Sequence, residues 1–435
     1  MLKSKFIKDK NFVLLFFGNL VSGVGSRIHG FGISLFLLDL TGKATSTATY
    51  LAIWTFIIFI FGPIAATFTD RMKKKAKVLV FTDYSRGISY LLTALFVFIG
   101  LRTNNTTLTT ITIYVSVLLI GIQTAFFSPA VTSLIPEIVE KDELVSASSV
   151  MQITRSIQNI AGLLFGALLY VKFGIVVLMI INATSFIVSG FSEMFIKSES
   201  KHITEDFVKP TSIKETFTGI FKDLKGAIVY LFKGGKPVLV IAFIILISAT
   251  LVSPWFAIGE PFMFKEYFNF NNFEPEYLLA SSNFFNSLGV ILMSLVVAQI
   301  AAKFKIYQLI RVGGFLFILI GVSYFFIVKA FDTRMIVENS FIFLFVGASF
   351  IGGMVNAIIN APLSASLQKY IDPKMLGKVS TFLDSIGGML FPISALIVGY
   401  LLDHTGLYEP LFLMIFAMVL ITLVAYRSKE LKKLA

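Results

Sequence analysis

Three carboxylic acids lie within long apolar stretches of the sequence: Asp39, Glu260 and Asp384. A carboxyl group that is shielded from water can bind and release a proton near neutral pH, which is the chemistry that a proton-coupled process requires. We expect Glu260 or Asp384 to do this, with Asp39 as a third candidate. The segment SPWFAIGEPF around Glu260 is favourable, because its two prolines can interrupt a helix and Trp255 can offer an aromatic face.

Basic side chains also occur inside apolar segments. Arg27 and His29 lie together in GVGSRIHGFG, and Arg155 lies in a polar stripe that includes Gln152. A charge at mid-membrane costs at least about 2.5–3.5 kcal/mol on insertion scales, so these groups should face protein or water. If Arg27 and Arg155 share a cavity, its positive field favours an anionic or zwitterionic ligand. The alternatives are a fixed ion pair or backbone contact for Arg27 and a packing role for His29.

The composition indicates where these groups are held. The chain has 435 residues, 56% of them hydrophobic and 14% charged, and a mean hydropathy of +0.85. Charge is concentrated between apolar runs of roughly 20 residues, which is the length that spans a bilayer. Such runs must be helical, because lipid offers the backbone no hydrogen-bond partners. We predict an all-α membrane protein with twelve transmembrane helices at about 12–40, 50–69, 78–100, 108–135, 144–170, 174–196, 237–264, 275–302, 306–329, 338–366, 377–402 and 408–426.

Lys and Arg are distributed unevenly over the connections between these spans. They concentrate in MLKSKFIKDK at the N-terminus, in TDRMKKKAK at Thr69–Lys77, in the central loop and after Tyr426. Cytoplasmic loops are enriched in such cations, so we expect a multi-pass protein of the cell membrane with both termini in the cytoplasm. The net charge of +12 then reflects contact with anionic lipid headgroups at the inner face and not with nucleic acid.

The longest polar stretch, Lys197–Lys236, divides the chain near its middle. We expect a six-helix bundle over 1–196, a cytoplasmic loop with an amphipathic segment over 197–236, and a second six-helix bundle over 237–435. SPAVTSL at Ser128–Leu134 is similar to APLSASL at Ala361–Leu367, and each closes the fourth helix of its half. This repeat predicts two bundles related by pseudo-two-fold symmetry, as in transporters built from parallel repeats.

Three longer stretches extend the comparison: FGPIAATFTDRMKKK at Phe61–Lys75, FFSPAVTSLIPEIVEKDELVSAS at Phe126–Ser148, and DPKMLGKVSTFLDSIGGMLFPISALIVGYLLDHTG at Asp372–Gly406. They resemble the major facilitator superfamily (MFS), and within it the branch of macrolide efflux proteins and siderophore exporters. The resemblance implies the MFS fold, secondary transport by alternating access, and a monomer.

The loop after the second helix resembles the family's gate motif. Asp70, Arg71, Lys74 and Lys75 match it, whereas Ala66 and Lys73 stand where the family has glycines. The resemblance implies a cytoplasmic gate. In it, Asp70 would cap the N-terminus of the eleventh helix near Leu376–Lys378, and Arg71 would pair with Glu137. An exposed Asp70 in a simple turn is the alternative reading.

Other positions bear on the expected cavity and on proton coupling. The substrate cavity is expected to include Arg27, His29, Gln152, Arg155, Trp255, Asn283, Asn286, Asn356 and Asn360. The segment 108–135 has no Lys or Arg, although many proton-coupled relatives have an arginine there, and the fifth helix keeps only Gly162 and Gly166 of the antiporter pattern. These departures argue against proton antiport without excluding it. Asp83 and Arg86, three residues apart, are expected to form a structural pair.

We therefore expect a secondary exporter of drug-like or amphiphilic small molecules, driven by protons through antiport. A second possibility is an exporter or flippase of an anionic amphiphile, such as a siderophore, haem or a lipid-linked species. A membrane-embedded enzyme or sensor lacks support, because the three histidines, His29, His202 and His404, are too scattered for a metal site and no nucleophile motif is present. With no cysteine and no phosphate-binding GxxxxGK[ST] loop, neither a metal nor another cofactor is expected.

Overall fold

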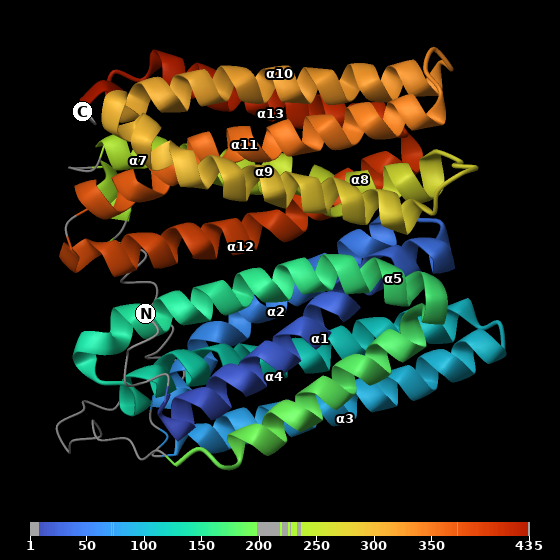
Figure 1. Ribbon diagram of the computed structural model, residues 1–435, viewed down its shortest axis with the longest axis vertical. Coiled ribbons are helices and arrows are strands. Elements are labelled where there is room, and N and C mark those ends of the chain that lie inside the picture. The colour runs from blue at the N-terminus through green and yellow to red at the C-terminus, as the bar shows by residue number, and fades with distance from the viewer. Residues whose placement is uncertain are drawn as a thin grey trace. The chain divides into compact units, whose positions relative to one another are not determined.

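The computed structural model describes residues 8–70, 72, 74–197, 218–219, 225–226, 228–232, 236–371 and 373–433, and the regular elements in these ranges are helices (Figure 1). Most of the central loop, with its expected amphipathic segment, lies outside them. The helices cluster into two compact units. The first comprises Met1–Thr41 and Ile53–Ile220, and the second comprises Gly42–Ala52 and Phe221–Ala435. The second helix therefore begins in one unit and continues in the other.

The N-terminal part of the chain forms five long helices, α1 (Lys10–Thr41), α2 (Ala44–Asp70), α3 (Lys75–Arg102), α4 (Thr106–Ile138) and α5 (Leu144–Glu193). α5 contains two crossings, because Gly174 leaves the helical conformation at φ 71° and ψ 179°. Glycine adopts such a positive φ without the steric cost that a Cβ imposes. Eleven of the described helices are long and apolar enough to span a bilayer, and the division of α5 confirms the predicted total of twelve crossings.

The C-terminal part contains α7 (Lys236–Ile247), α8 (Glu260–Phe262), α9 (Pro275–Lys303), α10 (Ile306–Asp332), α11 (Glu338–Tyr370), α12 (Pro373–His404) and α13 (Tyr408–Arg427). The span between α7 and α9 is interrupted, as its prolines predict. Three π-helical turns, Ser248–Val252, Trp255–Gly259 and Met263–Tyr267, alternate with short helical pieces around Glu260. Single π-turns inside helices are often found at functional sites.

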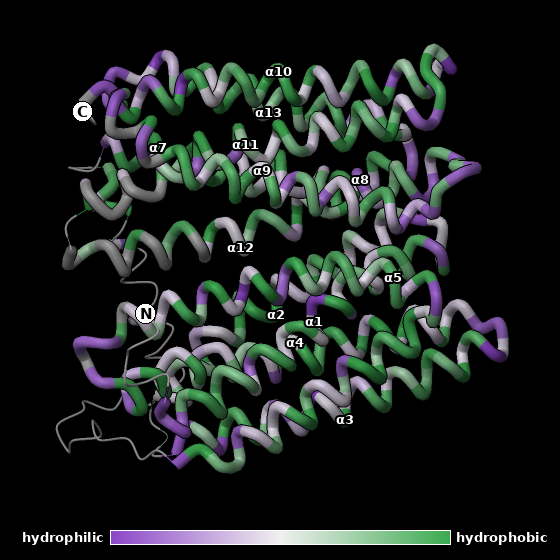
Figure 2. Tube along the Cα trace, in the orientation of Figure 1, coloured by the Kyte–Doolittle hydropathy of each residue, from purple (hydrophilic) through white to green (hydrophobic). Residues whose placement is uncertain are grey.

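Small residues bring the helices of the first unit close together. A Cβ on Gly162 of α5 would lie 2.3 Å from the Cβ of Arg27 on α1, so these helices touch along their backbones. Association of this kind is driven by packing, since lipid is as apolar as the helices themselves. Figure 2 shows hydrophobic residues along most of each helix and hydrophilic residues concentrated near the helix ends. Polar groups inside the bundles therefore need specific partners.

Candidate functional site

The second unit contains a polar cavity of about 170 Å³ beside the interrupted helix. Its polar lining residues come from four spans and are Ser248, Ser253, Glu260, Ser282, Asn283, Asn286, Tyr324, Ser349 and Asn356. An adjoining cavity of about 190 Å³ shares Ser248, Ser253 and Asn356 and adds Asn360, whose Nδ2 donates to Asn356 Oδ1 at 2.8 Å. The four asparagines expected in the cavity thus line these two connected spaces.

Glu260 is the buried acid of this cavity, with 2% of its surface exposed. The Ser282 hydroxyl donates to Glu260 Oε1 at 2.5 Å, and hydroxyl contacts of 2.9 Å join Ser282 to Ser349 and Ser349 to Tyr324. Among the described residues, no cationic side chain interacts with this carboxylate. A buried carboxylate without a countercharge is expensive when ionised, so binding a proton is the chemistry this arrangement supports.

Trp255 does not line either of these two cavities. Its side chain is only 1% exposed and packs inside the second unit, and its Nε1 has no hydrogen-bond partner among the residues that the structure describes. The π-helical turn that starts at Trp255 changes which side chains face the cavity, and Phe256, not Trp255, contributes to the lining. Sequence periodicity assumes a regular α-helix and therefore misplaces this ring.

The other two acids expected to couple protons differ from Glu260. Asp39 is an exposed side chain near the end of α1, and its Oδ2 accepts a hydrogen bond from the Tyr170 hydroxyl at 2.5 Å. It does not line either of the two cavities. The side chain of Asp384 lies outside the described residues. Glu260 is thus the acid for which both burial and a polar cavity are present.

Arg27 and Arg155 come together on the first unit, α1 supplying one and α5 the other. Both side chains are exposed, as is that of Gln152. The two guanidinium groups are close enough for Arg155 to repel Arg27. Because exposed charges at this depth cannot face hydrocarbon, this side of the unit must face water or protein.

His29 lies on a different face of α1 from Arg27. It is 4% exposed, and its ring meets that of Tyr90 edge-on with the ring centroids 4.9 Å apart. Two residues along a helix correspond to about 200° of rotation, so neighbouring polar residues in the sequence point in nearly opposite directions. His29 and Arg27 therefore do not share one face of α1, and the contact with Tyr90 fits the packing role.

The expected cytoplasmic gate is only partly described. Arg71 and the side chain of Asp70 lie outside the described residues, as do the side chains of Leu376–Lys378. Glu137 pairs with Lys75, whose Nζ lies 2.7 Å from Glu137 Oε1, and both side chains are largely buried. Lys74 is exposed just before α3. Lys75, another residue of the motif, thus pairs with the acid that the resemblance proposes for Arg71.

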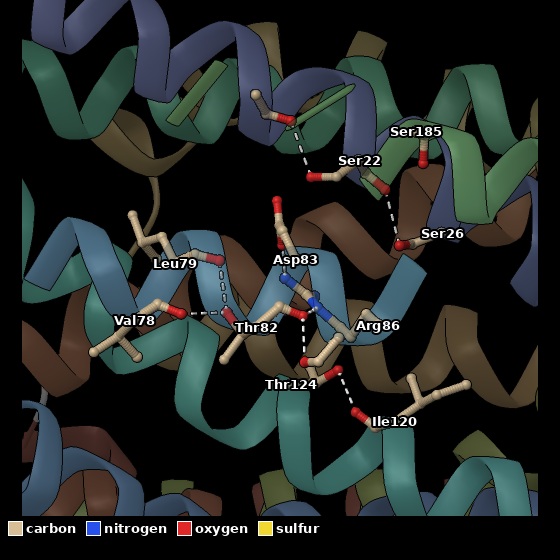
Figure 3. Close-up of polar contacts among 12 residues, drawn as sticks. Ser22, Ser26, Val78, Leu79, Thr82, Asp83, Arg86, Ile120, Thr124 and Ser185 are labelled. Carbon is tan, nitrogen blue, oxygen red and sulfur yellow. Dashed lines mark hydrogen bonds and ion pairs between the residues drawn. The ribbon is translucent and has the colours of Figure 1, made fainter. Parts of the chain in front are cut away.

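The expected pair of Asp83 and Arg86 is confirmed as a buried salt bridge on α3. The guanidinium also donates from Nε to the carbonyl oxygen of Thr82 at 3.3 Å. Figure 3 shows Asp83 pointing from α3 toward the part of α1 that carries Ser22. The pair thus lies inside the first unit.

Asp403, which the sequence analysis did not single out, holds the first turn of α2. Its Oδ1 accepts from the Ala44 amide at 2.6 Å, and its Oδ2 accepts from the Thr45 amide at 3.1 Å and from the Thr45 hydroxyl. A carboxylate at a helix N-terminus satisfies free amides and complements the helix dipole. The only signal in the sequence was an acid at the end of a span, just before HTG.

Replacing Asp403 with alanine should destabilise this contact. Hydrogen bonds to charged groups contribute about 1.5–3 kcal/mol, so we expect a clear decrease in thermal unfolding temperature in detergent. The exposed acid Asp142 offers a matched control, and Asp142→Ala should change the unfolding temperature little. Equal unfolding temperatures for Asp403→Ala and the wild type would show that the cap is energetically unimportant.

Comparisons with known proteins agree with this architecture. The family model described as Major Facilitator Superfamily matches residues 15–384. An uncharacterised MFS-type transporter of Bacillus subtilis, YkuC, is 26% identical, with 98% of this chain and 95% of the relative covered. Macrolide efflux protein A of Streptococcus pyogenes is 22% identical, with 97% of each chain covered.

Solved structures show the same fold at low identity. The nucleoside transporter NupG aligns with a TM-score of 0.67 and 12% identity over 97% of this chain and 98% of its own. A bacterial homologue of the iron transporter ferroportin aligns with a TM-score of 0.69 and 13% identity over 98% and 99%. With the family model covering most of the sequence, this chain belongs to the Major Facilitator Superfamily and is a multi-pass membrane transporter, not an enzyme.

Proposed function

We propose that this transporter exports an amphiphilic, drug-like molecule by alternating access and that Glu260 couples export to proton antiport. The observation that carries the proposal is the Glu260 carboxyl group, which is buried in a polar cavity and has no ionic partner among the described residues. A carboxyl group that is protonated when exposed to one side and ionised when exposed to the other converts a proton gradient into movement of substrate.

The substrate class follows from the lining of the two cavities and from one relative. Asparagine amides, serine hydroxyls and Phe256 and Phe317 offer hydrogen bonds within a partly apolar space, which suits an amphiphilic ligand. The similarity to macrolide efflux protein A supports export of such molecules. The protein is expected to act as a monomer in the cell membrane, with both termini in the cytoplasm.

Transport into inverted vesicles tests the proposal. Proteoliposomes that contain the purified protein should accumulate dyes or macrolides against a gradient when the lumen is acidic. When a protonophore collapses the pH gradient, the substrate concentrations inside and outside should become equal. Accumulation that is insensitive to the pH gradient would overturn proton coupling. Transport of the same molecules only down their gradient would overturn secondary active export.

A second candidate is an exporter or flippase of an anionic amphiphile, such as a siderophore, haem or a lipid-linked molecule. The neighbouring Arg27 and Arg155 favour it, because two like charges are costly to hold together unless an anion joins them. Their exposed position allows a ligand to reach both groups.

Arg27→Ala discriminates between these candidates. If the arginine pair binds an anionic group, the variant should lose most transport of an anionic dye and keep transport of its cationic counterpart. Binding of a ligand by a charge-assisted contact contributes about 1.5–3 kcal/mol, so the loss should be roughly ten- to a hundredfold. Equal transport of both dyes, unchanged in Arg27→Ala, would remove the anionic candidate.

A further inference from the structure

Glu193, the last residue of α5, is a buried acid that the proposed function does not use. Its side chain is fully buried, and no residue in the described part of the chain makes a well-formed hydrogen bond to either carboxylate oxygen. The Ser189 hydroxyl, one turn earlier on the same helix, is also fully buried and lies within reach of both Glu193 and Asp83. Buried polar atoms without a well-formed hydrogen bond are rare in folded proteins, and they indicate that a proton or a ligand belongs at the site.

Three helices of the first unit enclose Glu193. A Cβ on Gly18 of α1 would lie 3.0 Å from Ser189 Oγ and 3.3 Å from Glu193 Cγ. A Cβ on Gly190 of α5, three residues before Glu193, would lie 3.4 Å from the Cβ of Asp83 on α3. The glycines therefore let α1 and α3 close over the acid and exclude water from it.

The charged groups around Glu193 do not balance. α3 supplies Asp83 and Arg86, which act on Glu193 by repulsion and attraction respectively, and α1 supplies no charged group at Gly18 or Ser22. With both acids ionised, two negative charges would share one arginine. Within the described ranges, Asp83 Oδ2 also has no well-formed hydrogen bond, although the other oxygen of this carboxylate is bound by Arg86 (Figure 3).

Arg86 is held too firmly to serve both acids in turn. Its guanidinium carbon lies 4.1 Å from the ring centre of Phe127 and 4.2 Å from that of Phe186, so two aromatic rings enclose it. Cation–π contacts at a desolvated site stabilise this position. If Asp83 and Glu193 were both ionised, one buried negative charge would therefore remain without a cation. An unpaired buried ion is strongly destabilising.

We propose that Asp83 and Glu193 form a second proton-binding site, which holds one exchangeable proton against the fixed charge of Arg86. The proton forms an O–H bond with one carboxyl oxygen, and its release to water leaves the carboxylate. The Ser189 hydroxyl lies beside Glu193 and can donate to whichever acid is ionised. This site lies in the first unit, whereas Glu260 belongs to the second, and the inference does not require Glu260 to couple transport.

Other buried polar groups continue from this site along the same helix faces. Asn182 lies on the face of α5 that carries Ser185 and Ser189, and no described residue accepts a hydrogen bond from its Nδ2. His29 Nε2 on α1 is likewise buried, and it has no hydrogen-bond partner in the same described ranges. These groups extend the polar interior of the first unit away from the helix end at Glu193, which gives a proton at this site polar neighbours on one side.

Infrared titration of the purified full-length protein in detergent tests the site. A protonated carboxylic acid has a carbonyl stretch that is separate from carboxylate bands and shifts in heavy water. At neutral pH the wild type should show such a band from the shared proton, and alkaline buffer should remove it. Glu193→Gln should abolish this band, whereas Glu140→Gln, which alters an exposed acid between α4 and α5, should keep it.

Asp83→Asn provides the decisive second variant. It leaves one acid and one arginine, so the cluster is neutral without a proton and the band should disappear here too. Persistence of the band in Asp83→Asn would show that Glu193 is neutral on its own and would overturn sharing; its persistence in Glu193→Gln would overturn the site. A band that appears only after sodium is replaced by a large organic cation would assign the site to sodium instead. The protonation of Glu260, the acid of the proposed function, is tested separately by the loss of its own carbonyl band in Glu260→Gln.

Discussion

Glu260→Gln should abolish accumulation of substrate driven by a pH gradient while preserving movement of substrate down its own gradient. Glutamine keeps the shape of the side chain and its hydrogen bond with Ser282, but it cannot release a proton. A gradient of one pH unit supplies about 1.4 kcal/mol per proton, enough for about tenfold accumulation. We expect this accumulation to fall to equal concentrations on the two sides of the proteoliposome membrane.

A matched control separates coupling from folding. Glu274→Gln alters an exposed acid just before α9 and should accumulate substrate like the wild type. Substrate exchange in the absence of a pH gradient verifies that Glu260→Gln is folded and competent. Undiminished uphill transport by Glu260→Gln would exclude this residue as the coupling group, and Asp384 would then be the next acid to change.

Arg86→Leu should severely reduce the amount and thermal stability of folded protein. The substitution leaves Asp83 and Glu193 buried without their cation, and breaking a buried ion pair by removing one partner costs about 3–5 kcal/mol. Adding Asp83→Asn removes one of the stranded acids, so the double variant should recover a substantial part of the loss. Size-exclusion profiles and unfolding temperatures in detergent measure both effects.

Arg102→Leu provides the control on the same helix. Arg102 is exposed at the end of α3, with its guanidinium carbon 5.2 Å from the ring centre of Phe98. An exposed contact of this kind contributes about 0.5–1 kcal/mol, so the variant should unfold only slightly earlier than the wild type. Similar stability of Arg86→Leu and Arg102→Leu would contradict the buried charge balance, as would a double variant no more stable than Arg86→Leu alone.

Burial explains why the sequence pointed to Glu260 but missed Glu193. Glu260 is flanked by Pro254 and Pro261 within an apolar run, and both features are visible in the sequence. Glu193 lies at the end of a span, where acids are usually solvated. A weak signal was present in Ser189, because residues four apart share one face of a helix. Only the approach of α1 and α3 shows that this face is closed to water.

The sequence by itself determined the membrane class and the number of crossings. Apolar length and the need of the backbone to bond with itself are local constraints, and they act on each span separately. Even the break in α5 was foreseeable, since it falls at Gly174, the first residue of the predicted sixth span.

Tertiary structure decided which side chains meet. It placed His29 inside the bundle, paired Lys75 with Glu137, and brought Asp403 to the first turn of α2. Such pairings depend on the rotation of each helix and on the close approach that glycines permit. A turn of one residue, about 100°, moves a side chain from one environment to another, and hydrophobic periodicity in a lipid-facing helix is too weak to define that angle.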